Sequence, residues 1–366
     1  MKKLYSIIGI TIMLTACNTA KESTVVNFTR NDFNDHVVLT NPIEIPWGDP
    51  SDVTNSESFV LLHDSIILVQ NSYGMPFAIE LYSLYSGRHI AKLAPIGRGP
   101  GEFLDCFYTG HSMDQRKIYF KDRQKSTFYI VDFCKTLEKG ALVIDRQFQY
   151  YPNYLSVDLV VLDDRYYTQY NMWYIDCKQY NNNVPKLQKY EIEPIQKPAP
   201  LPDDPMSGYK YWVGQANGAR ILLNPDKNEL WLFDQRSDRI EIYSEALELA
   251  KTLYGPDHFN IQYEVKTAVD IDIQGVVFAQ EKNYQTYISY AYNAKHIFVI
   301  YMGSDLFSET NPPVEIFKLD WEGNLLCNYK LDRYISNISI DSQEEYLYGT
   351  ARQSYDDSPK FVRYKL

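Results

Sequence analysis

A unit of three short strands repeats along this chain, and this repeat constrains the fold more than any other feature. Its clearest copy runs over Leu230–Leu253 (LWLFDQRSDRIEIYSEALELAKTL), where apolar and polar residues alternate between clusters of turn-forming residues. Alternation with a period of two is typical of antiparallel strands that have one buried face. Regular repetition of one such unit predicts a propeller or a solenoid.

Six copies of the unit are present, and each is expected to form one blade of a β-propeller. They cover Phe59–Leu93, Phe107–Gln149, Ser156–Ile192, Ala219–Leu253, Tyr287–Leu331 and Ile335–Leu366. The last copy stops after three strands, whereas His36–Ile45 (HVVLTNPIEI) is a strand-like segment without a nearby partner. A propeller must close its ring or leave exposed sheet edges. We therefore predict an all-β domain over residues 35–366, a six-bladed β-propeller of four-stranded antiparallel blades whose ring is closed by this N-terminal strand. Seven blades and two joined β-sandwiches are the alternatives.

Two connections are longer than a propeller requires. Residues 194–205 contain five prolines and predict an extended surface loop, because proline cannot donate a hydrogen bond to a strand. The connection Tyr254–Glu281 is expected to hold a short helix or an extra strand. Neither connection resembles a domain boundary, so one domain is expected.

The N-terminus has the features of an export signal. Two lysines precede an apolar stretch, Leu4–Leu14, which is too short to span a bilayer as a helix. The stretch ends in Leu-Thr-Ala-Cys, which resembles the lipobox of bacterial lipoproteins. The resemblance implies that residues 1–16 are a signal peptide, that Cys17 carries the lipid, and that residues 17–34 form a lipidated tether. Asn18 follows the cysteine, as in lipoproteins sent to the outer membrane, so we expect a cell-envelope protein that is anchored to a membrane and is periplasmic or surface-exposed.

Charge and cysteine content exclude two classes of function. The net charge of −11 argues against binding nucleic acid through a broad basic face. The other cysteines, Cys106, Cys134, Cys177 and Cys327, are far apart and lack the spacing of a metal site. We expect buried thiols, although an oxidising envelope would permit disulfides.

A glycine-rich stretch, IGRGPGEF, links the first two blades. Its glycines, Gly97, Gly99 and Gly101, favour a tight path, and Glu102 and Phe103 follow directly. Phe103 is expected to pack between adjacent blades. The stretch is similar to the G-x-G-P-G-E-F loop of the TolB-like and NHL-related six-bladed propellers, which are common as lipoproteins in Bacteroidetes. The resemblance implies a propeller architecture and an envelope location, and little about substrate.

No motif for a catalytic nucleophile is present. His111 falls on the inner strand of the second blade, and Asp158, Asp163 and Asp341 are inner-strand acids. These residues do not form a recognisable ligand set, so we expect no cofactor, with a divalent metal in the central channel as the alternative. The aromatic residues around the third blade, Tyr150 to Tyr174, are expected to pack between blades or to stack on a ligand.

The sequence favours binding over catalysis. We expect a non-enzymatic binding or scaffold module that recognises a protein, a peptide or a glycan. The alternative is a hydrolase or lyase that acts in the channel, with or without a metal, and a third possibility is a structural component of an envelope complex. A propeller fold alone does not decide among them, because one architecture hosts many functions.

Overall fold

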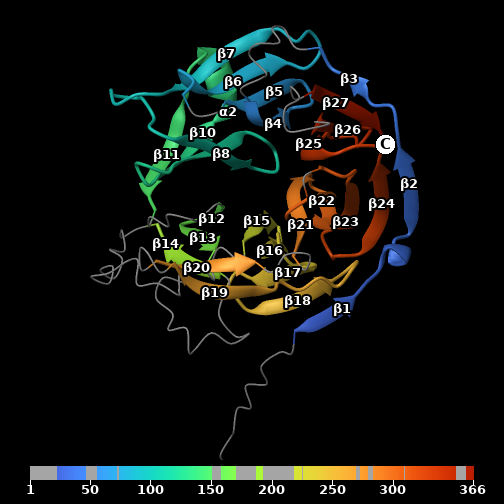
Figure 1. Ribbon diagram of the computed structural model, residues 1–366. Coiled ribbons are helices and arrows are strands. Elements are labelled where there is room, and N and C mark those ends of the chain that lie inside the picture. Colours follow the sequence, from blue (N-terminus) through green and yellow to red (C-terminus); the bar gives the residue numbers. More distant parts are fainter. Residues whose placement is uncertain are drawn as a thin grey trace, which may run out of the picture.

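The computed structural model shows a ring of β-sheets around a central axis (Figure 1). It describes residues 23–46, 56–71, 74–150, 158–169, 187–192, 218–224, 226–268, 273–278, 283–308, 310–351 and 360–366. The signal peptide predicted for residues 1–16, the lipidation site at Cys17 and the proline-rich loop at residues 194–205 lie outside these residues.

Blades one to three follow the predicted repeats, and in each the first strand lies innermost. Blade one comprises β4 (Ser56–Leu62), β5 (Ile66–Asn71), β6 (Phe77–Ser83) and β7 (His89–Pro95). Blade two comprises β8 (Cys106–His111), β9 (Lys117–Asp122), β10 (Thr127–Asp132) and β11 (Ile144–Gln149). Blade three has three described strands, β12 (Leu159–Leu162), β13 (Arg165–Gln169) and β14 (Leu187–Glu191). A further strand predicted at residues 173–180 lies outside the described residues.

Blades four to six complete the ring, so the predicted six-bladed all-β propeller is confirmed. Blade four comprises β15 (Ala219–Asn224), β16 (Glu229–Asp234), β17 (Arg239–Ser244) and β18 (Leu249–Tyr254). Blade five comprises β21 (Tyr284–Tyr292), β22 (His296–Asp305), β23 (Glu315–Asp320) and β24 (Leu325–Leu331). Blade six comprises β25 (Ile335–Ile340), β26 (Tyr346–Ala351) and β27 (Lys360–Lys365).

The core lies between neighbouring sheets. Trp231, Phe233 and Phe317 are fully buried in one cluster that joins blades four and five. A second cluster joins blades five and six through residues such as Ile316 and Leu347. Because both faces of each blade are covered by its neighbours, strands such as β16 have a continuous apolar run, Leu230 to Phe233, instead of alternating.

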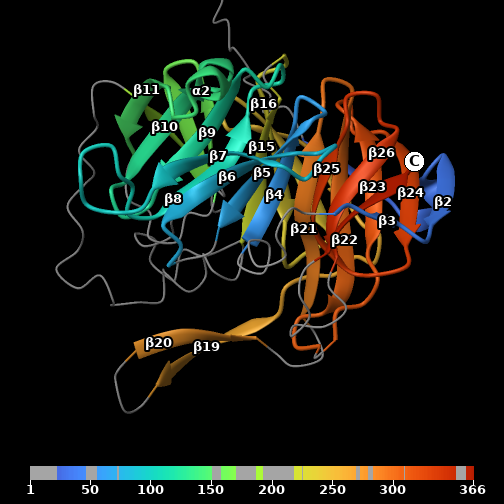
Figure 2. The same cartoon turned by 90° about the horizontal axis from the view of Figure 1, so that it is seen from above.

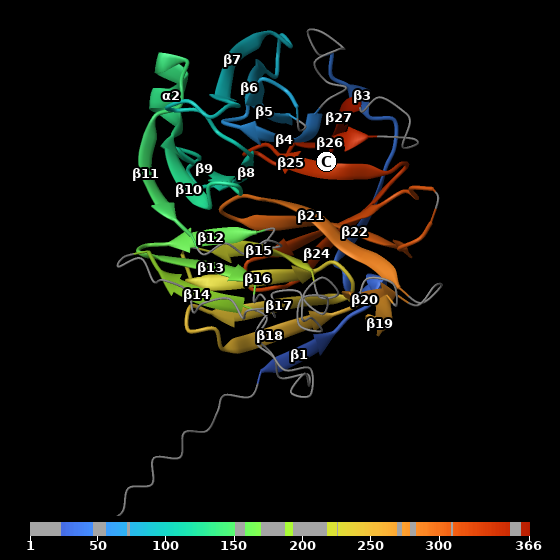
Figure 3. The ribbon, with the colours of Figure 1, turned by 60° about the vertical axis from the view of Figure 1, so that its left-hand side comes forward.

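The N-terminal segment runs along the outer rim of blades four, five and six (Figures 1 and 3). We call residues 24–44 the strap. β1 (Thr24–Asn27) pairs in parallel with β18, and β2 (Asp35–Leu39) pairs in parallel with β24. β3 (Ile43–Glu44) then pairs antiparallel with β27, as the fourth strand of blade six.

These pairings correct two expectations. The single closing strand expected over residues 36–45 is two strands on two blades, because Asn41, with φ 55°, and Pro42 turn the chain from one sheet to the next. The tether expected over residues 17–34 is incorrect from Thr24 onward. β1 and the short 3-10 helix η1 (Arg30–Asp32) lie there, and Phe28 and Phe33 are buried beside Phe317. The available signals were these two aromatic residues and the apolar pair Val25 and Val26 in a stretch that is polar elsewhere.

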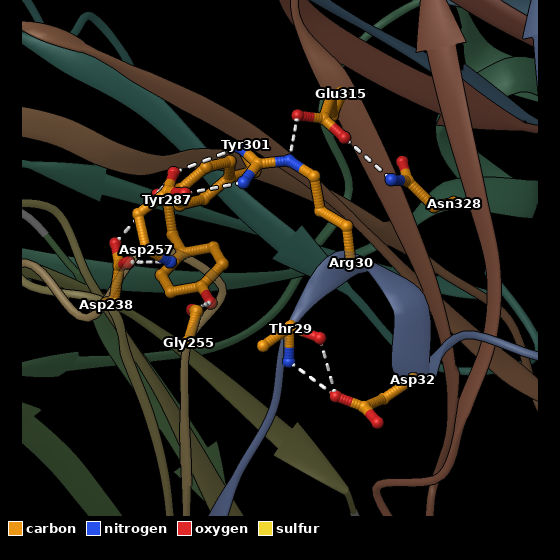
Figure 4. A network of polar contacts seen from close by, with 10 residues as sticks. All are labelled: Thr29, Arg30, Asp32, Asp238, Gly255, Asp257, Tyr287, Tyr301, Glu315 and Asn328. Atoms are coloured by element: carbon orange, nitrogen blue, oxygen red, sulfur yellow. Dashed lines mark hydrogen bonds and ion pairs between the residues drawn. The ribbon is translucent and has the colours of Figure 1, made fainter.

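Arg30 holds the strap against blades four and five (Figure 4). Its guanidinium donates two hydrogen bonds to Asp257, at 2.5 and 3.0 Å, and one from Nε to Glu315 at 2.6 Å. The hydroxyl of Tyr301 lies 2.9 Å from carboxylate oxygens of both Asp257 and Asp238. Burial alone would raise the pKa of Asp257, but the hydrogen bonds from Arg30 and Tyr301 hold it below its ordinary value.

Two elements depart from a regular propeller. The connection expected to hold a helix or an extra strand forms a hairpin, β19 (Tyr263–Ala268) and β20 (Ile273–Phe278), which projects from the ring (Figure 2). The helix α2 (Phe133–Lys139) interrupts blade two between β10 and β11; Asp132 caps its start and Gly140 its end. Within the described residues, no helix is long and apolar enough to cross a membrane.

Candidate functional site

The candidate site is a cavity of about 570 Å³ on the ring axis. All six blades line it, chiefly through their innermost strands. Examples are Leu61 of blade one, His111 of blade two, Tyr290 of blade five and Ile338 of blade six. Cavities of about 300–1,000 Å³ are typical of sites for small organic ligands.

Charged side chains gather where the inner strands begin. Asp158 directly precedes β12, and its carboxylate accepts hydrogen bonds from Arg220 Nη1 and from the backbone N–H of Ile221, both at 3.2 Å. Arg123 donates from Nε to Asp105 at 2.8 Å, and its guanidinium lies 4.0 Å from the centre of the Phe107 ring. These contacts fix both arginines at the cavity wall.

Lys121 is a third basic side chain at this end of the cavity. We call Lys121, Arg123 and Arg220 the cationic cluster. Lys121 lies on β9, opposite Phe107 of the inner strand, and only 5% of its surface is exposed. Burial lowers the pKa of its amine to about 8, against the opposing influence of Asp158. A lysine buried at a cavity wall in this way is typical of functional sites.

Aromatic side chains close the axis where the inner strands end. The His111 and Tyr292 rings stack with centres 4.8 Å apart, and the Tyr292 hydroxyl donates to the His111 carbonyl at 2.9 Å. These residues end β8 and β21, which belong to opposite blades, so the pair bridges the ring. Burial lowers the pKa of His111 to about 4, so the imidazole is neutral at neutral pH. The cavity therefore has an aromatic end and a cationic end.

Hydrogen bonds between blades hold the walls in place. The Gln70 amide of blade one donates to the Cys106 carbonyl at 3.0 Å and accepts from the Tyr108 backbone N–H at 2.9 Å. The Tyr290 hydroxyl of blade five donates to the Ile221 carbonyl of blade four at 2.6 Å. The cavity is thus preformed, which reduces the entropy lost when a ligand binds.

The glycine-rich loop lies outside the cavity and connects blades one and two. Phe103 is 4% exposed and packs in the cluster shared by these blades, with its ring centre 5.0 Å from that of Tyr129. The Glu102 carboxylate accepts from the Gly99 backbone N–H at 2.5 Å and fills the space in which side chains at positions 97 and 99 would lie. The expected packing of Phe103 between blades agrees with this arrangement.

Gly101 is the position of this loop that requires glycine, because its φ is +78°. We expect Gly101→Val to lower the free energy of unfolding by roughly 1–3 kcal/mol through backbone strain. Gly99→Ala should cost less, since the facing Glu102 side chain is able to shift. Urea denaturation of both variants would measure the difference; equal stability of Gly101→Val and the parent protein would contradict this role.

The structure separates the other residues singled out in the sequence. Asp163, in the β12–β13 turn, is exposed, and the Asp341 carboxylate accepts hydrogen bonds from the backbone N–H groups at positions 345 and 346.

Of the cysteines, Cys106, Cys134 and Cys327 are free thiols, and among these three Cys134 alone is exposed. Tyr150, Tyr166 and Tyr167 are buried between blades. The remaining aromatic residues of that group, and Cys177, lie outside the described residues.

Sequence reasoning singled out His111 and Asp158 at the channel, and the structure places both at the cavity wall, at opposite ends. It missed Lys121, Arg123 and Arg220. A lysine within the strand KIYFKD was the only signal for this cluster. Among the described residues, no group of three or more histidine, cysteine or acidic side chains is placed to hold a metal ion.

A ring of six blades around an axial cavity defines a six-bladed propeller, a class whose fold supports binding or scaffolding. The chain belongs to the TolB-like six-blade propeller family, whose model matches residues 59–343. This confirms the family that the glycine-rich loop resembles. Among curated proteins, none matches the sequence significantly.

Solved structures share the fold at low sequence identity. A member of the DUF4221 family from Bacteroides vulgatus is 11% identical, with a TM-score of 0.57 over 90% of this chain and 97% of that chain. A Bacteroides fragilis protein, described provisionally as exported, is 13% identical, with a TM-score of 0.51 over 93% of this chain and 99% of that chain. At these identities the likeness concerns the fold alone.

Proposed function

We propose that the protein is a non-enzymatic binding module of the cell envelope that recognises part of a protein, peptide or glycan in its axial cavity. The observation that carries the proposal is the cavity of about 570 Å³, which is lined by all six blades. Hydroxyl groups on its wall, including those of Ser289 and Ser339, offer hydrogen bonds to a polar ligand. The Thr109 hydroxyl is buried there without a hydrogen-bond partner among the described residues.

The test is to fill the cavity. Ser289 lies on β21 and lines the cavity, so Ser289→Trp should occlude it. The parent protein would be applied to peptide and glycan arrays, and every ligand it binds should be lost by Ser289→Trp. Lys92→Trp, on the outer strand β7, is the matched control and should retain them. Ligands that bind Ser289→Trp as well as the parent protein would refute a channel site.

The proposed location rests on the lipobox-like stretch that ends at Cys17. We expect Cys17→Ser to abolish incorporation of labelled palmitate and to release the protein from the membrane fraction. A Cys134→Ser variant is the control, because that thiol is exposed and far from the N-terminus in sequence. Continued labelling of Cys17→Ser would show that the lipid is not attached there.

A hydrolase or lyase that acts in the channel is the second candidate, and Lys121 is the observation that favours it. An amine with a pKa of about 8 is partly unprotonated near neutral pH and can act as a nucleophile or base. Mass spectrometry of a bound ligand after prolonged incubation distinguishes the candidates. A binding module returns the ligand unchanged, whereas an enzyme returns a product.

A further inference from the structure

The charge of the cationic cluster is opposite in sign to the net charge of the whole chain. The whole chain carries a net charge of −11, yet three basic side chains line one end of the cavity. Among the described residues, two carboxylates face them, Asp158 and Asp105. Desolvating Lys121 is unfavourable, and an acidic protein does not need a buried cation to remain soluble.

We propose that the cavity selects ligands that carry an anionic group, a carboxylate or a phosphate, and that the cationic cluster binds this group. The proposal rests on the proposed function, because it names the chemistry recognised by the same cavity. Charge-assisted hydrogen bonds from guanidinium and ammonium groups are the strong contacts available to such anions.

The geometry leaves donors for a ligand. Within the part of the chain that the structure describes, the contacts to carboxylates engage Nη1 of Arg220 and Nε of Arg123, and each guanidinium carries five N–H groups. Asp158 and Asp105 therefore orient the two arginines without consuming them. Lys121 lies on β9, two residues before Arg123, and lines the cavity, so an anion there meets basic groups from blades two and four.

The remainder of the cavity favours an apolar or aromatic body. Tyr108 and Tyr290 line the wall beyond the cluster, and the stacked His111–Tyr292 pair ends it. His111 is neutral and adds no charge at this end. A compact organic anion placed with its charged group toward Lys121 would bury its body against these rings.

Matched small molecules test the proposal without knowledge of the natural ligand. Phenylacetate, phenyl phosphate and the neutral phenylacetamide have the same ring, and ligand-detected NMR titration gives a Kd for each. We expect at least one anion to bind about tenfold or more tightly than the amide, as a charged hydrogen bond implies. The two anions distinguish a carboxylate site from a phosphate site. Equal Kd values for the anions and the amide would overturn the proposal.

Substitutions test whether the cationic cluster is the site at which the anion binds. Lys121→Met and Arg123→Gln should each weaken anion binding by about tenfold and leave amide binding unchanged. Arg123 is half exposed, so its variant remains informative if Lys121→Met fails to fold. Lys92→Met, on the outer strand β7, is the control. Anion binding that survives both cluster substitutions would contradict the assignment.

Failure of this inference is distinguishable from failure of the proposed function. If array ligands depend on an open cavity but anions bind no better than the amide, the cavity binds a neutral ligand. If Ser289→Trp leaves all binding intact, both proposals fall.

The pH dependence provides a second readout. Lys121 loses its charge as the pH rises through about 8, so anion binding should weaken between about pH 7 and pH 9. Among the described residues, the charged groups around Lys121 are Asp158, Asp105, Arg123 and Arg220. Lys121→Met should therefore flatten the profile, and an unchanged profile in that variant would count against a role for Lys121.

Discussion

A chain that lacks residues 23–46 is expected to lose most of its folded stability and to aggregate. The strap buries Phe28 and Phe33 between blades four and five. Truncation of a fully buried phenylalanine typically costs about 3–5 kcal/mol, and the whole stability of a domain is about 5–15 kcal/mol. Loss of two such side chains therefore removes a large share of the total.

Loss of β3 adds a second effect. β27 would lose its outer partner and expose the edge of blade six, where another chain can pair. β18 and β24 would also become edges, since β1 and β2 cover them. We expect concentration-dependent aggregation in addition to a lower unfolding midpoint.

Thermal unfolding and light scattering would measure both effects, with a chain that begins at residue 23 as the control. An intermediate deletion, residues 23–34, separates the contributions: it removes the phenylalanines but retains β2 and β3. Hydrogen exchange in the intact protein tests the same pairing, and exchange at β3 should be as slow as at β27. Fast exchange throughout the strap, or a deletion variant as stable as the control, would show that the strap does not secure the ring.

Gly255→Val is expected to loosen the strap through a single side chain. Gly255 follows β18, has φ +155°, and its backbone lies against that of Phe28. An added Cβ would overlap the Phe28 carbonyl group, whose carbon would lie 2.9 Å away. Unlike a flexible side chain, this backbone group is held by the Phe28 N–H bond to the Tyr254 carbonyl at 2.9 Å. Overpacking and backbone strain together predict a loss of roughly 2–5 kcal/mol.

Gly74→Val is the matched control for the Gly255 prediction. Gly74 also has a positive φ, +95°, but no atom of a described residue lies within 4 Å of an added Cβ. It should therefore show backbone strain without a clash, and the difference between the two variants reports the contact with the strap. Chemical denaturation gives both values. If the two substitutions cost the same, close packing of Phe28 on Gly255 does not contribute.

Much of the fold could be predicted from the sequence because the signals are local. Alternating strands such as β17 (RIEIYS) and polar turns recur in every blade, and their spacing gives the number of blades. The glycine-rich loop is also local, since Gly101 needs its backbone conformation whatever surrounds it. α2 was missed because the apolar Phe133 continues the pattern of β10, and only the cap at Asp132 ends the strand.

The position of the strap could not be predicted from local sequence patterns. The sequence of residues 24–44 contains strand-like segments, but parallel pairing with β18 and β24 depends on chain positions more than 200 residues away. The same holds for Arg30, whose acidic partners Asp257 and Glu315 belong to different blades. No spacing in the sequence brings these residues together.

The sequence by itself determined the class of fold, the blade count and the loop between blades one and two, because each rests on the conformation of a few neighbouring residues. The tertiary structure alone decided the candidate site. Lys121, Arg123 and Arg220 come from two blades and meet only because closing the ring brings the inner ends of the sheets to one axis. Their function depends on that convergence and on burial at the cavity wall, and neither property exists in the unfolded chain.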